Sequence, residues 1–161
     1  GLIKISFFVA YIYIISLMND IKRVFQYHGA EHKSIFAYEK GLELTVDNVK
    51  KMPRLHPRCG TNFIFVVLMV STFVFSFFTF ENVLTRSILK LIFFPVVAGI
   101  AYEIIKIAGK YQNPFTRVLI LPGLLMQKIT TREPDEKQIE VAIAALQATL
   151  DKTEVVSPSP T

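Results

Sequence analysis

Residues 61–80 read TNFIFVVLMVSTFVFSFFTF, twenty residues without a charged side chain. A helix of about 20 apolar residues matches the thickness of the hydrocarbon core of a bilayer. Gly60 and Thr61 stand where a helix N-terminus is expected, because small and hydroxyl-bearing residues favour that position. The stretch therefore predicts a membrane-spanning helix, and it decides the fold class: an all-α integral membrane protein.

The composition of the whole chain agrees with a membrane environment. Of its 161 residues, 52% are hydrophobic, and the mean hydropathy of +0.42 is high for a soluble domain. The net charge of +5 can indicate a nucleic-acid partner, but no continuous basic face with interleaved aromatic residues accompanies it. We therefore expect the lipid bilayer, and no nucleic acid, as a partner. A single cysteine excludes an internal disulfide.

Two further segments are expected to cross the membrane, which gives about three spans. Residues 2–18 are apolar except for one lysine and two serines, and about 17 residues is the lower limit for a span. Residues 87–107 return through the membrane, with Glu103 near one end. Residues 118–126 are apolar but short and broken by Pro122, which favours an interfacial or re-entrant segment.

The pattern divides the chain into three parts. We expect a membrane-embedded helical domain at 1–126 with a site loop at 19–60, an amphipathic helix at 127–151 and a disordered tail at 152–161. The loop carries eight basic and five acidic residues, and the positive-inside rule places it and the C-terminal helix in the cytoplasm. The sequence begins at Gly1 without an initiator Met, so we expect an upstream portion.

Local signals predict several helix ends. Gly41 is expected to stop a helix, and Thr45 to begin a short one. Asp135 and Gln138 have the spacing of a capping pair. The Asn-Pro dipeptide at 113–114 is interpreted as a turn.

The segment YHGAEHK at 27–33 carries the main candidate for chemistry. On a helix, His28 and His32 lie one turn apart on one face with Glu31 beside them, so two imidazoles can share one metal while a carboxylate handles protons. The third ligand must come from elsewhere. Glu103 is the expected choice, because a carboxylate among apolar residues of a span is costly unless it is paired or bound. Pairing with Lys106 is the alternative.

A second cluster, LHPRCGTN at 55–62, precedes the central span. Arg58 near a helix N-terminus is suited to bind an anion. His56 and Cys59 are alternative metal ligands. The other interpretation is a membrane-entry loop, in which arginine meets phosphate headgroups and cysteine is a small apolar residue.

The pattern H-x-x-E-H at 28–32 resembles the motif of the inverzincin peptidases. The resemblance implies that the two histidines bind zinc, that Glu31 is the general base and that a downstream glutamate, here Glu103, completes the site. It covers only these residues, and because inverzincins are soluble it concerns the ligands and not the fold.

Four longer stretches together resemble the YqhQ-like family of bacterial multi-pass membrane proteins. They are YHGAEHKSIFAYEKG at 27–41, LHPRCGT at 55–61, AYEIIK at 101–106 and LPGLLMQKITTREPDEKQIEVAIAAL at 121–146. The family is one of unknown function whose members are described as metal-dependent enzymes. The resemblance implies a location in the bacterial plasma membrane, a region before the first span and a single site formed by the shared stretches.

We therefore expect a membrane-bound metal-dependent hydrolase, either metallopeptidase-like or directed at lipids. His28, His32 and Glu103 would hold a divalent metal, zinc by expectation, and Glu31 would act as the base. An amphiphilic substrate or its anionic group would be bound by Arg58, Cys59 and His56.

Two other classes of function compete with this one. In a non-enzymatic scaffold, the histidine cluster would be a structural metal or polar node, and the C-terminal helix would bind a protein partner or a second copy. In a transporter, Glu103 would lie in an ion path, but two or three spans without paired broken helices argue against that.

Overall fold

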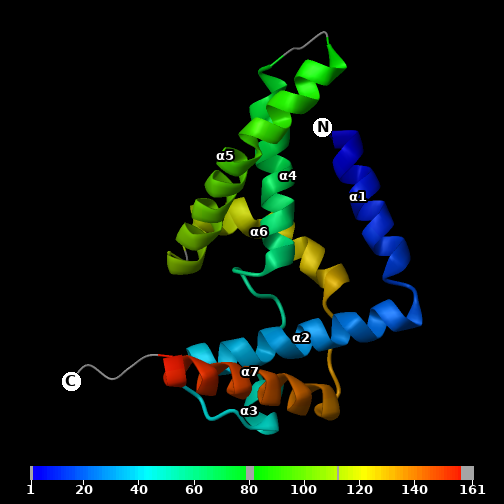
Figure 1. Cartoon of the computed structure of the whole chain (residues 1–161). Coiled ribbons are helices and arrows are strands. Elements are labelled where there is room, and N and C mark those ends of the chain that lie inside the picture. Colours follow the sequence, from blue (N-terminus) through cyan, green and yellow to red (C-terminus); the bar gives the residue numbers. More distant parts are fainter. Residues whose placement is uncertain (1, 79–81, 112, 157–161) are drawn as a thin grey trace, which may run out of the picture. The chain divides into compact units, whose positions relative to one another are not determined.

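The computed structural model describes the backbone of residues 2–78, 82–111 and 113–156. These residues form α-helices and no strand, which confirms the all-α class (Figure 1). The helices are α1 (Leu2–Ile15), α2 (Asn19–Glu39), α3 (Val46–Lys50), α4 (Gly60–Ser76), α5 (Val83–Lys110), α6 (Pro114–Thr130) and α7 (Glu136–Val156).

The chain divides into two units, each with its own apolar core. One unit comprises Gly1–Ile14 and Pro57–Ile129 and holds α1, α4, α5 and α6; we call it the α4–α5 unit. The other comprises Ile15–His56 and Thr130–Thr161 and holds α2, α3 and α7; we call it the α2–α7 unit.

In the α4–α5 unit, α4 and α5 pack against each other as an antiparallel pair (Figure 1). Their core is formed by Val66, Ala101 and Ile105, with further apolar side chains against it. Cys59 caps α4, because its Sγ accepts a hydrogen bond from the Thr61 N–H at 3.4 Å. The expected helix start at residues 60–61 is therefore confirmed.

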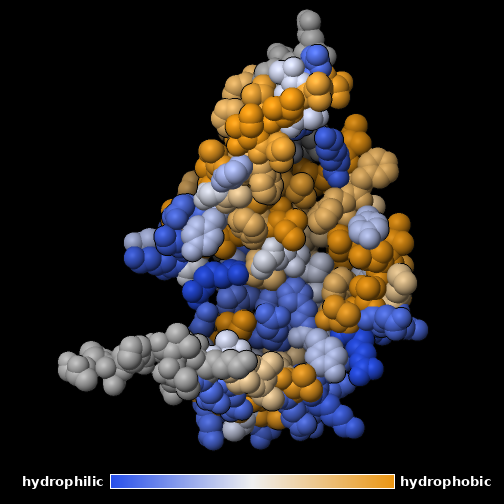
Figure 2. All heavy atoms as spheres, viewed as in Figure 1, coloured by the Kyte–Doolittle hydropathy of each residue, from blue (hydrophilic) through white to orange (hydrophobic). Residues whose placement is uncertain are grey.

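Helix α5 has the length and the composition of a membrane span. In the described part of the chain it is the one helix that is long and apolar enough to cross a membrane by itself, and only 17% of its most apolar window is buried. Leu91 and Val96 are 76% and 56% exposed. Figure 2 shows hydrophobic residues gathered over the α4–α5 unit. A core helix of a soluble protein would instead be mostly covered by other side chains.

The other two expected spans are shorter than predicted. Helix α1 has 14 residues and ends at Ile15 instead of continuing to residue 18, a length of about 21 Å at 1.5 Å per residue. Helix α4 has 17 residues and ends at Ser76, while residues 79–80 of the predicted span lie outside the described residues. Helices α1 and α2 together would add a second span only if they form one broken span. The topology of about three spans stays a prediction.

The interpretation of residues 113–126 was wrong in two respects. The dipeptide at 113–114 is a helix N-terminus and not a simple turn: the Thr116 N–H donates to Asn113 Oδ1 at 2.8 Å, and Pro114 begins α6. Proline is favoured there because the first helical N–H needs no partner within the helix. Pro122 lies inside α6 and does not break it.

In the α2–α7 unit, α2 and α7 run side by side in the same direction (Figure 1). Their shared core contains the following residues: Ala30, Ala37, Val49, Ile139 and Ile143. Small alanines on α2 let the isoleucines of α7 approach closely, and burial of this apolar surface holds the unit together.

The predicted helix ends of this unit are largely confirmed. Gly41 has a positive φ of 66° just after α2, where glycine carries no steric penalty. Thr45 caps α3. Asp135 and Gln138 form a reciprocal capping pair at 2.8 and 2.9 Å. Helix α7, however, continues to Val156, beyond the expected end near residue 151. Residues 157–161 of the expected tail lie outside the described residues.

Candidate metal-binding site

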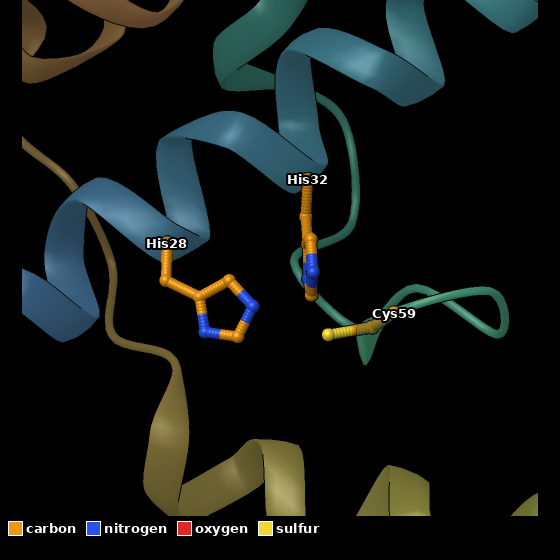
Figure 3. A group of neighbouring side chains, drawn as sticks. All are labelled: His28, His32 and Cys59. Atoms are coloured by element: carbon orange, nitrogen blue, oxygen red, sulfur yellow. The ribbon is translucent and has the colours of Figure 1, made fainter. Parts of the chain in front are cut away.

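His28 and His32 form the core of the candidate site. They lie one turn apart on α2 with their rings on the same side of the helix (Figure 3). The ring centroids are 4.3 Å apart, and ligand nitrogens of the two rings lie within 4.8 Å of each other. His32 is buried and His28 is half-buried. The pair therefore has the spacing that two imidazoles need to share one ion.

Backbone carbonyl groups hold both rings through the same nitrogen. Nδ1 of His28 lies 2.8 Å from the Thr130 carbonyl oxygen, and Nδ1 of His32 lies 2.6 Å from that of Arg54. A carbonyl oxygen can only accept a hydrogen bond, so each Nδ1 carries the proton and donates it. The lone pair of each neutral ring is then on Nε2. Histidine ligands of metal sites show this arrangement, in which the outer hydrogen bond sets the tautomer and the ring orientation.

The Thr130 carbonyl reaches His28 because the segment after α6 passes directly over α2. The Arg132 N–H donates to the Phe25 carbonyl at 2.8 Å. A Cβ on Gly29 would lie 2.1 Å from the Arg132 carbonyl oxygen, so only glycine allows this approach. Arg54 adds a hydrogen bond from Nη1 to the Thr131 carbonyl at 3.1 Å.

A buried lysine joins the same three chain segments. Lys33 lies 2.9 Å from the Glu133 carboxylate, and its Nζ donates to the Lys50 carbonyl at 3.1 Å. Its side chain is 7% exposed. Because a buried ammonium group is costly without partners, these contacts favour one position of residues 130–133 beside the histidines.

His56 lies beside the pair in the same unit. Its ring centroid is 5.6 Å from that of His32 and 4.5 Å from that of Phe36. Its Nε2 lies 3.5 Å from the Glu39 carboxylate. The structure therefore places all three histidines of the chain in the α2–α7 unit, which the spacing of His56 in the sequence did not indicate.

The two predicted carboxylates differ from expectation in their surroundings. Glu31 is exposed on α2, and no hydrogen bond or ion pair joins it to another described residue. Glu103 belongs to the α4–α5 unit, is 55% exposed within the chain, and pairs with Lys106 at 3.3 Å. Lys106, the alternative partner expected for Glu103, therefore forms an ion pair with it. Metal ligation by Glu103 and base catalysis by Glu31 stay predictions.

Arg58 and Cys59 belong to the α4–α5 unit, at the start of α4. Arg58 is exposed and lies against Gly109 of α5, where a Cβ would come within 2.7 Å of the arginine side chain. Cys59 is buried, at 8% exposure.

The residues that sequence reasoning missed are Arg54 and Thr130, which act through backbone carbonyls that leave no signal in a sequence.

These features define a class: an all-α protein with a membrane-length apolar helix and a pair of neighbouring histidines, each anchored through Nδ1, that could hold a metal ion. The chain belongs to the family described as "Protein of unknown function (DUF1385)", whose model matches residues 1–152. It is 42% identical over 151 residues to the "Uncharacterized protein YqhQ" of Bacillus subtilis (strain 168). The match covers 93% of this chain and 48% of that protein, so the chain spans about half the length of this relative.

No solved structure matches the chain. The family and the relative confirm the resemblance to YqhQ-like proteins. Neither description names a reaction, a metal or a membrane side.

Proposed function

We propose that this chain is part of a membrane-bound, metal-dependent hydrolase whose metal is held by Nε2 of His28 and Nε2 of His32. The observation that carries the proposal is the shared Nδ1 anchoring, at 2.8 Å to Thr130 and 2.6 Å to Arg54. One such bond is common for a histidine in a protein interior. Two on neighbouring turns of one helix leave Nε2 as the ligand atom of both rings, whose centroids are 4.3 Å apart, and this favours a shared ligand.

Cys59 is the third ligand in this proposal. His56 lies against His32 in the α2–α7 unit, and Cys59 follows it by three residues. Consecutive Cα atoms are 3.8 Å apart, so the Cα of Cys59 stays within about 11 Å of that of His56 whatever the arrangement of the units. Two imidazoles and one thiolate are a donor set that suits zinc and leaves a fourth position open. Glu103 is the competing third ligand.

The chain's own residues then have distinct roles. His28 and His32 would hold the metal, and the Thr130 and Arg54 carbonyls orient the two rings. Glu31, one residue before His32, accepts a proton. When bound, a divalent metal of this kind acts as a Lewis acid and lowers the pKa of water. The three-span topology, with the loop 19–60 and the C-terminal helix in the cytoplasm of a bacterial cell, belongs to the same proposal.

Metal content tests the two histidine ligands. An asparagine side chain places an N–H donor near the position of histidine Nδ1 and has nothing at Nε2, so the double variant His28→Asn/His32→Asn keeps the anchors and removes the ligand atoms. We expect about one zinc per detergent-purified wild-type chain and almost none in the variant. Circular dichroism should show the same helix content in both. Equal metal in the two proteins would remove the proposal.

The third ligand is tested by two single variants. Cys59→Ser should lower the zinc affinity at least tenfold, while Glu103→Gln should leave it unchanged. Glu103 pairs with Lys106, so its loss removes only an exposed ion pair. If Glu103→Gln lowers the zinc affinity and Cys59→Ser does not, the third ligand is Glu103 and not Cys59.

A non-enzymatic scaffold is the second candidate, and the exposure of Glu31 favours it, because no described contact orients that carboxylate toward the histidines. Glu31→Gln separates the two. A hydrolase keeps its metal in this variant and loses turnover of amphiphilic ester substrates. A scaffold shows no turnover in either protein, and chelation of a structural metal lowers its Tm strongly.

A further inference from the structure

The α4–α5 unit contains a pocket whose lining includes one residue of the proposed metal site, Cys59. It lies where the start of α4 meets the last turns of α5 and has a volume of about 570 Å³. Its cationic lining residues are Arg58, Lys106 and Lys110, and no aspartate or glutamate lines it. A cluster of three positive charges in the lining favours an anionic occupant.

The remaining walls of the pocket are largely apolar. Phe63 of α4 and Tyr102 and Ile105 of α5 line it between the cations. A pocket for a fully hydrated inorganic ion would need few such surfaces, whereas an amphiphile presents a charged group and an apolar portion side by side. The composition of the lining therefore favours an anion attached to an apolar body.

The arrangement of the cations points to a phosphate. Gly109 lets the Arg58 side chain lie flat against α5, since a Cβ there would be 2.7 and 2.8 Å from its Cδ and Cγ. Arginine offers several N–H groups in a planar fork that matches phosphate oxygens, and lysine adds point charge. The N-terminus of α4, a helix of 17 residues, contributes backbone N–H groups to the same place.

The position on α5 indicates the source of the phosphate. Lys106 and Lys110 lie at the C-terminal end of the helix that can span a membrane, Val83–Lys110. Basic residues at the end of a span lie at headgroup depth, where anionic lipids gather. Lys106 also pairs with Glu103 at 3.3 Å, but both side chains are more than half exposed, so that pair is weak and leaves the lysine charge available.

We propose that this pocket binds the phosphate of an anionic phospholipid headgroup, with Arg58 and Lys110 as its main contacts and the apolar wall against the glycerol and the start of the acyl chains. The proposal does not depend on a metal at His28 and His32. It assigns the start of α4 a lipid-recognition role that neither the family description nor the relative states.

Native mass spectrometry of the detergent-purified chain tests the pocket with phosphatidylglycerol and phosphatidylcholine as probes. We expect one phosphatidylglycerol to remain bound and phosphatidylcholine to bind at least fivefold less. Arg58→Gln/Lys110→Gln should reduce the phosphatidylglycerol adduct at least fivefold. The matched control is Lys22→Gln/Arg23→Gln, which removes the same charge from exposed positions of α2 and should change nothing.

A charge-preserving variant separates the pocket from general attraction of anionic lipid to a basic protein. Gly109→Ala keeps all three cations but displaces Arg58, and we expect it to weaken the adduct as well. Two results would overturn the proposal. One is an equal loss of the phosphatidylglycerol adduct in the control pair, and the other is an adduct that is unchanged both in Gly109→Ala and in Arg58→Gln/Lys110→Gln. Metal content of the same variants should stay at the wild-type value, so failure here is distinct from failure of the metal site.

Inorganic phosphate distinguishes the two sources of the group. If the headgroup is the ligand, millimolar phosphate leaves the phosphatidylglycerol adduct in place and shows no saturable binding by calorimetry. If soluble phosphate binds alone and displaces the lipid, the pocket is a phosphate site and the lipid assignment is wrong.

Discussion

At the scale of single residues, the histidine pair depends on groups that are distant in the sequence. His32 is anchored by a carbonyl 22 residues away and His28 by one 102 residues away. The H-x-x-E-H spacing predicted that the rings share a face, and this is confirmed by their centroid distance of 4.3 Å. It did not indicate which nitrogen of each ring carries the proton, because that is decided by backbone atoms of other segments.

Gly29 provides the clearest prediction at this scale. Gly29→Ala would gain helix propensity, but its Cβ would lie 2.1 Å from the Arg132 carbonyl oxygen, and backbone cannot yield as a flexible side chain does. We expect a loss of about 1–3 kcal/mol in the free energy of unfolding, because the strain of overpacking exceeds the propensity gain. Thermal unfolding in detergent measures it.

The control for Gly29 is Gly99→Ala on α5, where a Cβ would meet nothing within 4 Å. That variant should be neutral or slightly stabilising. If both alanine variants unfold alike, the close passage of residues 130–133 over α2 is not present in solution. Reduced zinc content in Gly29→Ala alone would further link this passage to the orientation of His28.

At the scale of elements, α3 and α7 are joined by an exposed ion pair. Lys50 Nζ lies 2.9 Å from Glu136 Oε1, at the first turn of α7. The hydrogen bond and charge of Lys50 lower the pKa of Glu136, and those of Glu136 raise the pKa of Lys50. A carboxylate in the first turn also interacts favourably with the helix dipole.

These pKa shifts predict that the ion pair stabilises the folded state at neutral pH and loses this effect both at low and at high pH. The stability that Glu136 contributes is fully present above the unfolded carboxyl pKa of 4.5 and is lost as pH falls through the lower pKa of the folded state. The stability that Lys50 contributes is fully present below the unfolded ammonium pKa of 10.5 and is lost as pH rises through the higher pKa of the folded state. Glu136→Gln should therefore lower Tm at neutral pH, with the difference vanishing in acid and in strong alkali.

Added salt should also reduce this difference in Tm, because exposed charges are screened. Glu140→Gln serves as the control, since Glu140 is exposed on the same helix and makes no ion pair among the described residues. A Tm difference that stays constant from acid to alkaline pH would show that Glu136 contributes by something other than its charge.

At the scale of the whole molecule, the proposed location in a lipid bilayer would account for the exposed apolar surface of α5. Val96 lies near the middle of the helix and is 56% exposed. Most of the apolar side chains around it on α5 are exposed to a similar degree. In water such a surface would drive aggregation. In lipid it needs no cover, and the helix satisfies its own backbone hydrogen bonds.

Val96→Lys tests this environment. A lysine at the centre of a span costs about 2.5–3.5 kcal/mol of insertion free energy. We expect a smaller inserted fraction in a membrane-insertion assay and partial release of the chain by alkaline carbonate. Val96→Leu should behave like the wild type. A wild-type chain that carbonate extracts fully would contradict the proposed span.

The sequence by itself determined the helical class, the apolar character of residues 61–80 and 87–107, the one-face placement of His28 and His32 and the caps at Thr45 and Asp135. These features depend on contacts within a few residues, so composition and period are sufficient to predict them. The same local reasoning failed at Pro122, which it interpreted as a break although α6 continues through it.

Only the tertiary structure decided what surrounds the candidate residues. It placed residues 130–133 over Gly29, put the Thr130 and Arg54 carbonyls on the two imidazoles and left Glu31 exposed. It also gathered Arg58, Lys106 and Lys110 around one pocket from segments about fifty residues apart. Every backbone carbonyl is chemically alike, and a charge has no partner until the chain is folded, so these relations come from packing between distant segments and have no local pattern.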